Sequence, residues 1–264
     1  MSATKPLILL TNDDGFFSEG IQVLADRLRE EGRIFIVAPD QEKSATSLAL
    51  NLHRPLRVKR IKPAVFAVNG TPADCVYMAI QKILPGKPDL LISGINPGPN
   101  LGQQDISYSG TVGGALQGAF LLIPSMAVSV LQDNKGRYHF EQASEICLKL
   151  MKRILQNRLP EGTALNVNIP PPPINGVKAV KLGQKRYNPE ISERIDPRDR
   201  PYYWIGTGRP KAIGDPDSDV MVIKEGFVTI TPIHKDLTDY GLIQSQRFKD
   251  TFLSIPHEIP KKTV

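Results

Sequence analysis

The stretch LILLTNDDGFFSEGIQVLADRLREEGRIFIV, residues 7–37, decides the fold class of this chain. Residues 7–11 (LILLT) form a short, continuous apolar run, which is typical of a strand buried on both faces of a sheet. After an Asp/Gly loop, apolar residues recur at helical spacing: Ile21, Leu24, Ala25 and Leu28. Residues 34–37 (IFIV) predict a second buried strand. A strand, a helix and a strand in this order form a βαβ unit, so we expect a parallel sheet.

The same alternation continues to about residue 170. Further strands are predicted at residues 54–60 and 64–68, for which a hairpin is one open arrangement, and at residues 90–93, 126–131 and 164–169. Helices are predicted at residues 72–84, 109–121 and 140–155. We therefore expect residues 1–170 to form a doubly wound, mostly parallel α/β core of Rossmann-like type, a sheet between two helical layers.

The character of the chain changes after four prolines at residues 170–173. Residues 171–264 are predicted to be an irregular C-terminal extension of the same structural domain, with strands at 177–182 and 226–232 and a last helix at 242–253. Residues 185–219 are rich in Pro, Asp, Arg and Tyr and show no clear periodicity. Trp204 lies there beside Tyr202 and Tyr203, and stacking on a base, burial and a subunit contact are all open for it.

Composition limits the classes of function. The chain has 264 residues and a net charge of +6, from 33 Lys+Arg against 27 Asp+Glu, which suits an anionic partner or serves solubility alone. Cys75 and Cys147 are far apart in apolar segments, so we expect free thiols and a reducing compartment. The apolar run at residues 7–11 is too short for a secretion signal or a membrane helix, so we expect a cytoplasmic protein with no membrane association.

The first polar loop that directly follows a predicted strand is Thr11-Asn12-Asp13-Asp14-Gly15. Ligands of parallel α/β sheets bind at the carboxyl ends of the strands. Adjacent carboxylates on a tight turn repel each other unless a cation lies between them, and hard oxygen ligands suit magnesium, manganese or calcium. The alternative is that Asp13 or Asp14 simply caps the following helix.

The second such polar loop is the glycine-rich loop SGINPGPNLG, residues 93–102, which leads to Ser109-Gly110-Thr111 at a predicted helix start. Glycines let backbone amides approach an anion, and helix N-termini bind phosphate through free N–H groups. Asn96 and Asn100 offer oxygens to a metal and donors to a phosphate. The alternative for Ser109 is an ordinary helix cap.

A third loop, residues 38–47, follows the second strand, and its Ser44 is either a hydroxyl ligand or a turn residue. Other chemistries lack support. The chain contains no P-loop, no GxGxxG fingerprint and no GxSxG elbow, and its histidines show no metal-ligand spacing.

These segments together are far more specific than any one alone. The order ILLTNDDG, VAPDQEKS, NGTPADCV, SGINPGPNLG and YSGTV resembles the SurE (stationary-phase survival) family of 5′-nucleotidases, from Leu7 to Val130. A fainter resemblance extends through GFVTITPIHKDLTDY near the C-terminus.

The resemblance implies a metal-dependent phosphatase acting on nucleoside 5′-monophosphates, sometimes also on 3′-monophosphates or short polyphosphate. It implies one divalent metal ion (Mg, Mn or Ca) per subunit, held by Asp13, Asp14, Ser44 and Asn96. It also implies a homodimer or homotetramer with exchanged C-terminal elements. The family usually has Gly after the ligand serine, whereas this chain has Ala45, which disfavours a positive φ.

From these segments we expect Asp13 or Asp14 to take a proton from water. The sequence leaves open which of the two does so. Asn12, Asn100, Ser109, Gly110 and Thr111 are the expected phosphate- and substrate-binding residues. No stable nucleic-acid complex is expected. The rival functions are a non-catalytic nucleotide-binding regulator and a metal-dependent nucleotide-sugar transferase.

Overall fold

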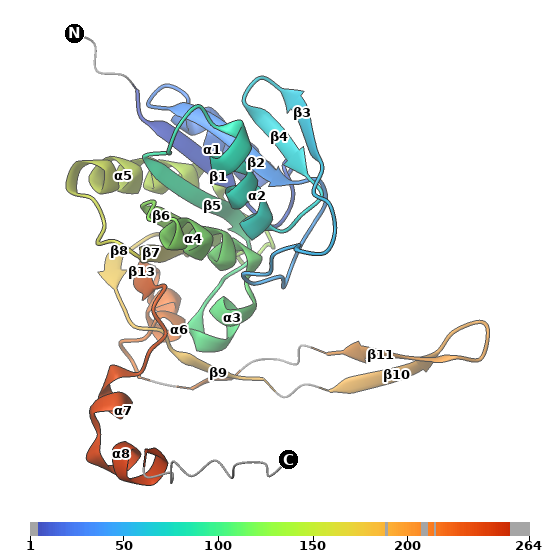
Figure 1. The fold of residues 1–264 in the computed structure, drawn as a ribbon, viewed down its shortest axis with the longest axis vertical. Coiled ribbons are helices and arrows are strands. Elements are labelled where there is room, and N and C mark those ends of the chain that lie inside the picture. The colour runs from blue at the N-terminus through green and yellow to red at the C-terminus, as the bar shows by residue number, and fades with distance from the viewer. Residues whose placement is uncertain (1–4, 188–189, 207–210, 214, 254–264) are drawn as a thin grey trace, which may run out of the picture.

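A nine-stranded sheet forms the centre of the molecule in the computed structural model, which describes residues 5–187, 190–206, 211–213 and 215–253. The strand order is β3-β4-β2-β1-β5-β6-β7-β13-β8 (Figure 1). The strands are β1 Leu7–Thr11, β2 Arg33–Pro39, β3 Val58–Lys62, β4 Val65–Val68, β5 Leu90–Pro97, β6 Ser125–Val130, β7 Thr163–Ile169, β8 Gly176–Ala179 and β13 Phe227–His234. Within this nine-stranded sheet only the β3–β4 and β7–β13 pairs are antiparallel, so the expected mostly parallel sheet is confirmed.

Helices cover both faces of the sheet. The helices α1 (Glu19–Leu28) and α5 (Phe140–Asn157) pack on one face, and α2 (Pro72–Met78) and α4 (Gly110–Phe120) pack on the other. The first strand shows why its sequence is continuously apolar. Ile8 and Leu10 belong to the core under α1 and α5, whereas Leu9 belongs to the core under α2.

Several predicted boundaries differ from the structure. The predicted strand 54–60 begins only at Val58, and the predicted helix 72–84 consists of α2 followed by a π-helical turn, η1 (Ala79–Ile83). A helix that we did not expect, α3 (Gly102–Tyr108), follows the glycine-rich loop. It is short, and Gly102 is its only buried residue, so it leaves no apolar periodicity in the sequence.

The C-terminal part contributes to the core more than its sequence suggests. Strand β13 lies between β7 and β8, antiparallel to the former and parallel to the latter. The predicted last helix, residues 242–253, is divided into α7 (Tyr240–Gln244) and α8 (Gln246–Phe252), because the Ser245 hydroxyl caps the second helix by accepting the Phe248 N–H at 3.2 Å.

Residues 185–219 contain short ribbons rather than a loop alone. Strand β9 (Gln184–Arg186) pairs with β12 (Lys211–Ile213), and β10 (Ile191–Ile195) pairs with β11 (Pro201–Ile205). The β10–β11 hairpin extends far from the body (Figure 1), and every residue of its strands is exposed. A two-stranded ribbon with no buried face needs no alternation of apolar and polar residues, so periodicity could not reveal it.

Within the described ranges, no helix is long and apolar enough to cross a membrane.

Candidate active site

The two polar loops that the sequence predicts after β1 and β5 lie on either side of the point where the strand order reverses. From β1 the chain goes out to β2 and β4 on one side and returns to β5 on the other side. Asp13 and Asp14 follow β1, and Asn96 lies near the end of the neighbouring β5. Crevices at such switch points are where open α/β sheets bind ligands.

Asp13 is buried, with 6% of its surface exposed, and is held on two sides. Its carboxylate accepts a hydrogen bond from the Thr111 hydroxyl at 2.5 Å, and its backbone carbonyl accepts the Lys43 N–H at 2.7 Å. Burial raises the pKa of Asp13, and the hydrogen bonds from the Thr111 side chain and backbone oppose that rise. A buried carboxylate whose negative charge is stabilised only by these hydrogen bonds favours a cation nearby.

Asp14 is half-buried, and its Oδ2 has no hydrogen-bond partner among the described residues. Burial raises the pKa of Asp14 to about 7, with added repulsion from Asp13 and Glu42. Glu42 lies in the loop after β2, where the sequence predicts only Ser44 as a site residue. Negative charge thus accumulates at this edge, and among the described residues no Lys or Arg forms an ion pair with either aspartate.

The start of α4 lies directly against Asp13. A Cβ atom added to Gly110 would come within 2.8 Å of Asp13 Cβ and 2.9 Å of its Oδ2, so a side chain at position 110 would displace the carboxylate. The Ser109 hydroxyl accepts the Val112 N–H at 3.0 Å, which is the geometry of a helix cap. Its own O–H hydrogen stays available to another acceptor.

Ser44 reaches the same edge in an exposed loop. Its hydroxyl donates to Glu42 Oε1 at 2.6 Å. The next residue, Ala45, has a φ of 56° and Ser47 has a φ of 51°, so this loop takes the left-handed conformation despite the lack of glycine. The loop path that glycine would favour is therefore kept.

Asn96 lies after a bulge in β5, where the pairing with β6 shifts between Ser93 and Asn96. The bulge depends on Gly94, because its φ is 135° and a Cβ atom there would lie 2.3 Å from the Val128 carbonyl oxygen. The Asn96 amide donates to the Gly98 carbonyl at 2.7 Å, which leaves its side-chain oxygen free of hydrogen bonds in the described chain.

Two of the residues that we expect to bind substrate use their side-chain amides for hydrogen bonds within the protein. Asn12 is fully buried, and its amide donates to Gly15 O at 2.9 Å and Ser18 Oγ at 2.7 Å, which shapes the Asp13-Asp14 turn. The Asn100 amide donates to Ser129 Oγ at 2.8 Å. The backbone carbonyl of Asn100 accepts hydrogen bonds from the side-chain amides of Asn166 and Asn168 in β7, so Asn100 anchors the glycine-rich loop to the sheet.

A residue that the sequence reading missed holds the other end of that loop. Asp219 is fully buried and accepts three backbone N–H groups, those of Gly102 at 2.8 Å, Gly183 at 2.7 Å and Val220 at 2.7 Å. Nearby, Asp105 of α3 pairs with Lys185 and accepts the Tyr187 hydroxyl at 2.5 Å. Apart from Val220, the partners are far apart in sequence, so only a tertiary structure could reveal these contacts.

The donor set fits a hard divalent cation. Buried oxygens without hydrogen-bond partners at this edge include Thr11 Oγ1, Asn12 Oδ1, Asp14 Oδ2 and Ser93 Oγ. All are oxygen atoms, which Mg²⁺, Mn²⁺ and Ca²⁺ prefer. Among the described residues no group of three or more His, Cys, Asp or Glu side chains is arranged to hold a metal, so a site here needs neutral ligands such as Ser44 and Asn96.

Comparisons with known proteins agree with this arrangement. The family model described as "Survival protein SurE" matches residues 8–189. The chain is 47% identical to the "5′-nucleotidase SurE" of Pelotomaculum thermopropionicum, over 90% of this chain and 92% of that protein. It is 40% identical to the "5′-nucleotidase SurE" of Aquifex aeolicus, over 92% and 98% of the two chains. The crystal structure of the SurE protein from Aquifex aeolicus superposes with a TM-score of 0.79 at 39% identity, covering 93% of this chain and all of that chain.

Proposed function

The chain belongs to the SurE family and is a 5′-nucleotidase, and from that premise we propose that Asp13, Asp14, Ser44 and Asn96 hold one divalent metal ion on which hydrolysis depends. The observation that supports the proposal most is the pair of adjacent, poorly solvated carboxylates at the switch point of the sheet. Such a pair is stable as two anions only when a cation shares it.

When bound by these residues, a divalent metal would act as a Lewis acid toward the phosphate and would lower the pKa of a water molecule. Asp14 is the better placed of the two aspartates to accept the proton of that water. Its Oδ2 carries no hydrogen bond from the described residues, whereas Asp13 is tied to Thr111.

The phosphate group is held by the start of α4. Ser109 is the N-cap of α4 and Gly110 begins the helix directly against Asp13, and the helix dipole favours an anion at this end. The fully buried Asn12 and the anchored Asn100 shape this site from behind rather than contact the substrate.

The subunits assemble through the β10–β11 hairpin of the C-terminal extension. One face of the β10–β11 hairpin is mostly apolar, with Glu193 as its one acidic residue, and presents Ile191, Ile195, Tyr203 and Ile205, which are 69%, 67%, 57% and 79% exposed. An apolar surface of this kind on a projecting hairpin is typical of a contact with another subunit, which suits a homodimer or homotetramer. The free, buried Cys75 and Cys147 suit a cytoplasmic protein.

The direct test is a phosphate-release screen over nucleoside 5′-monophosphates, 3′-monophosphates and short polyphosphate, with manganese, magnesium or EDTA. We expect release from 5′-monophosphates without any sugar acceptor, and its loss in EDTA. Equal rates in EDTA and manganese contradict the metal proposal, and binding without release favours a non-catalytic regulator.

A further inference from the structure

The edge of the sheet beside the active site carries an unusual concentration of positive charge. Residues 43–73 contain six lysines and arginines and no aspartate or glutamate. Five of them form what we call the basic edge, on β3 and the segment before it: Arg54, Arg57, Lys59, Arg60 and Lys62. All five are exposed, and in the described parts of the chain none of them forms an ion pair.

The basic edge begins where the catalytic residues lie. Strand β4 is parallel to β2, so its last residues reach the same edge of the sheet as the aspartates, and the Asp40 N–H donates to the Val68 carbonyl at 2.9 Å. Strand β3 is antiparallel to β4, so its first residues also lie at that edge. There the Arg57 N–H donates to Asn69 Oδ1 at 2.6 Å.

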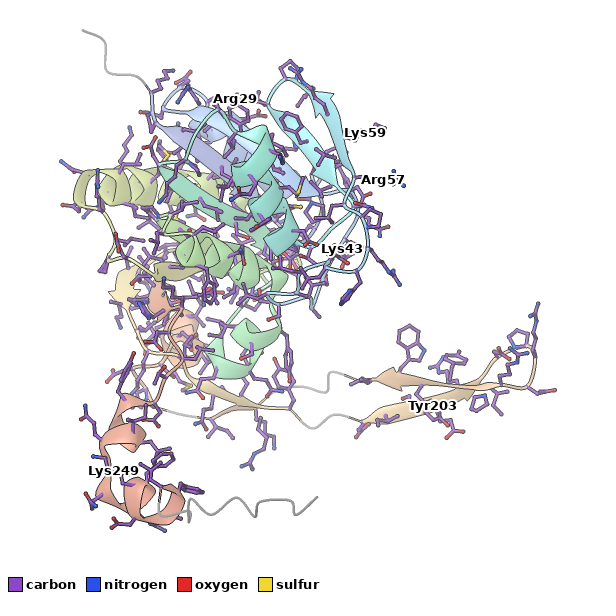
Figure 2. All side chains as sticks on the ribbon, viewed as in Figure 1. Arg29, Lys43, Arg57, Lys59, Tyr203 and Lys249 are labelled. Atoms are coloured by element: carbon purple, nitrogen blue, oxygen red, sulfur yellow. The ribbon has the colours of Figure 1, made fainter. Side chains whose placement is uncertain are left out.

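Lys43 links the aspartates to this charged surface, because its backbone N–H donates to the carbonyl of Asp13 at 2.7 Å. Figure 2 shows Lys43, Arg57 and Lys59 on the same side of the body, in a row that leads away from the site along the β3–β4 hairpin. The six residues 57–62 span about 20 Å of extended chain. The positive charge therefore continues well beyond the length of one nucleotide.

Apolar side chains are interleaved with the charges. Leu52 is 80% exposed, and Val58 and Ile61 are 38% and 39% exposed. A surface that combines cations with apolar contacts suits a chain that has both phosphates and bases, whereas polyphosphate has no apolar part. Arginine adds planar groups that bind phosphates in two-point contacts and stack on bases.

We propose that the basic edge binds the chain of a single-stranded oligonucleotide while its 5′-terminal phosphate lies at Asp13 and Asp14. Water attacks the phosphorus, the bond from phosphorus to the terminal 5′ oxygen breaks, and inorganic phosphate and an oligonucleotide with a free 5′ hydroxyl are released. The inference rests on the proposed function of the site. It concerns a transient substrate, not a stable nucleic-acid complex.

A different use of this charge is protection of an exposed edge strand, since lysines and arginines there discourage edge-to-edge pairing between molecules. That use predicts aggregation when the charges are removed, and no dependence of the kinetics on substrate length.

The test measures phosphate release by the intact protein from 5′-phosphorylated oligoadenylates of one, two, four and eight nucleotides, at low and high salt. We expect kcat/KM to rise about tenfold or more with length, through KM, and to fall more steeply with salt for the longer chains. The double variant Lys59→Gln/Arg60→Gln should lose this length dependence. Its matched control is Lys149→Gln/Arg153→Gln, two exposed cations of α5, which should keep it.

Equal kcat/KM for all lengths, or the same length dependence in both variants, overturns the inference while leaving the nucleotidase proposal intact. A similar gain with polyphosphate of matched charge, which lacks bases, contradicts an oligonucleotide-specific surface. Failure of the wild-type protein to release phosphate from the mononucleotide itself counts against the proposed function instead.

Discussion

The Thr111 hydroxyl, in the first turn of α4, donates a hydrogen bond to Oδ1 of Asp13 at 2.5 Å. This bond joins the proposed phosphate-binding helix to the proposed metal ligand, and a hydrogen bond to a charged group contributes about 1.5–3 kcal/mol. Thr111→Val should therefore weaken manganese binding about ten- to a hundredfold. Calorimetric titration with manganese measures the effect. Thr111→Ser keeps the hydroxyl and is the control, and equal affinities in the two variants would show that the bond is unimportant for the metal.

The pKa of Asp14, raised to about 7, makes stability depend on pH in the absence of metal. Between its ordinary value of 3.8 and about 7, the folded chain keeps a proton that the unfolded chain has lost, so stability falls as the pH rises through that range. Asp14→Asn should reduce this slope, leaving the part that comes from the raised pKa of Asp13, and should raise the metal-free Tm at pH 7.5. Manganese should raise the Tm of the wild type but not of the variant. Thermal scans at pH 5 and 7.5 with EDTA check the slope, and an unchanged one in Asp14→Asn contradicts the assignment.

Ala45 adopts a φ of 56°, in the left-handed region where a Cβ costs roughly 1 kcal/mol or more. Ala45→Gly relieves this cost but makes the unfolded chain more flexible, so we expect a net gain of at most about 1 kcal/mol, or a Tm rise of about 2–4 °C. Ala49→Gly, in the same loop without a positive φ, is the control and should lower the Tm or leave it unchanged. A fall in the Tm of Ala45→Gly as large as that of the control would refute the explanation.

Asp219 should be among the residues least tolerant of change outside the site. An asparagine has one acceptor oxygen for the three N–H groups that converge on Asp219, and its NH₂ group would face a donor. Leaving buried donors unpaired costs about 1–3 kcal/mol each, so Asp219→Asn should lower the free energy of unfolding by at least that amount. Asp217→Asn, two residues away and exposed, should have little effect. Urea denaturation of both variants provides the comparison.

If the apolar face of the β10–β11 hairpin holds the subunits together, charged side chains on that face should make the oligomer dissociate. Ile195→Glu combined with Tyr203→Lys places two charges on that face and should reduce the molar mass in light scattering to that of a smaller assembly or a monomer. Ser192→Lys, on the opposite face of the ribbon, is the control and should leave the molar mass unchanged. A monomeric wild-type protein at micromolar concentration contradicts the proposed assembly.

The sequence predicts those strands that are buried on both faces and those helices that are buried along one apolar stripe. Ile8, Leu9 and Leu10 have cores on both faces of β1, and α5 keeps one apolar stripe, so periodicity identified both elements. The short α3 and the exposed β10–β11 hairpin have no such pattern, and propensity alone does not specify them.

The site was predictable as a set of loops, because strand exits of a parallel sheet meet at one edge. Its internal contacts were not. Nothing in the local sequence indicates that Thr111 reaches Asp13, that Glu42 adds charge beside Asp14, or that Asp219 holds Gly102, because each contact depends on how distant segments pack.

The position of β13 has a consequence for the order in which the chain folds during synthesis. Strand β7 is complete at Ile169, but its neighbour on the outer side, β13, begins only at Phe227. Until then, β7 presents an unpaired edge, and β8 has no sheet to join, because β13 is the only strand with which β8 pairs in the described part of the chain. A ribosome making about 5–20 residues per second leaves that edge open for several seconds. During this interval the nascent chain is most vulnerable to pairing with a neighbouring chain, and a chaperone that covers the β7 edge would protect it.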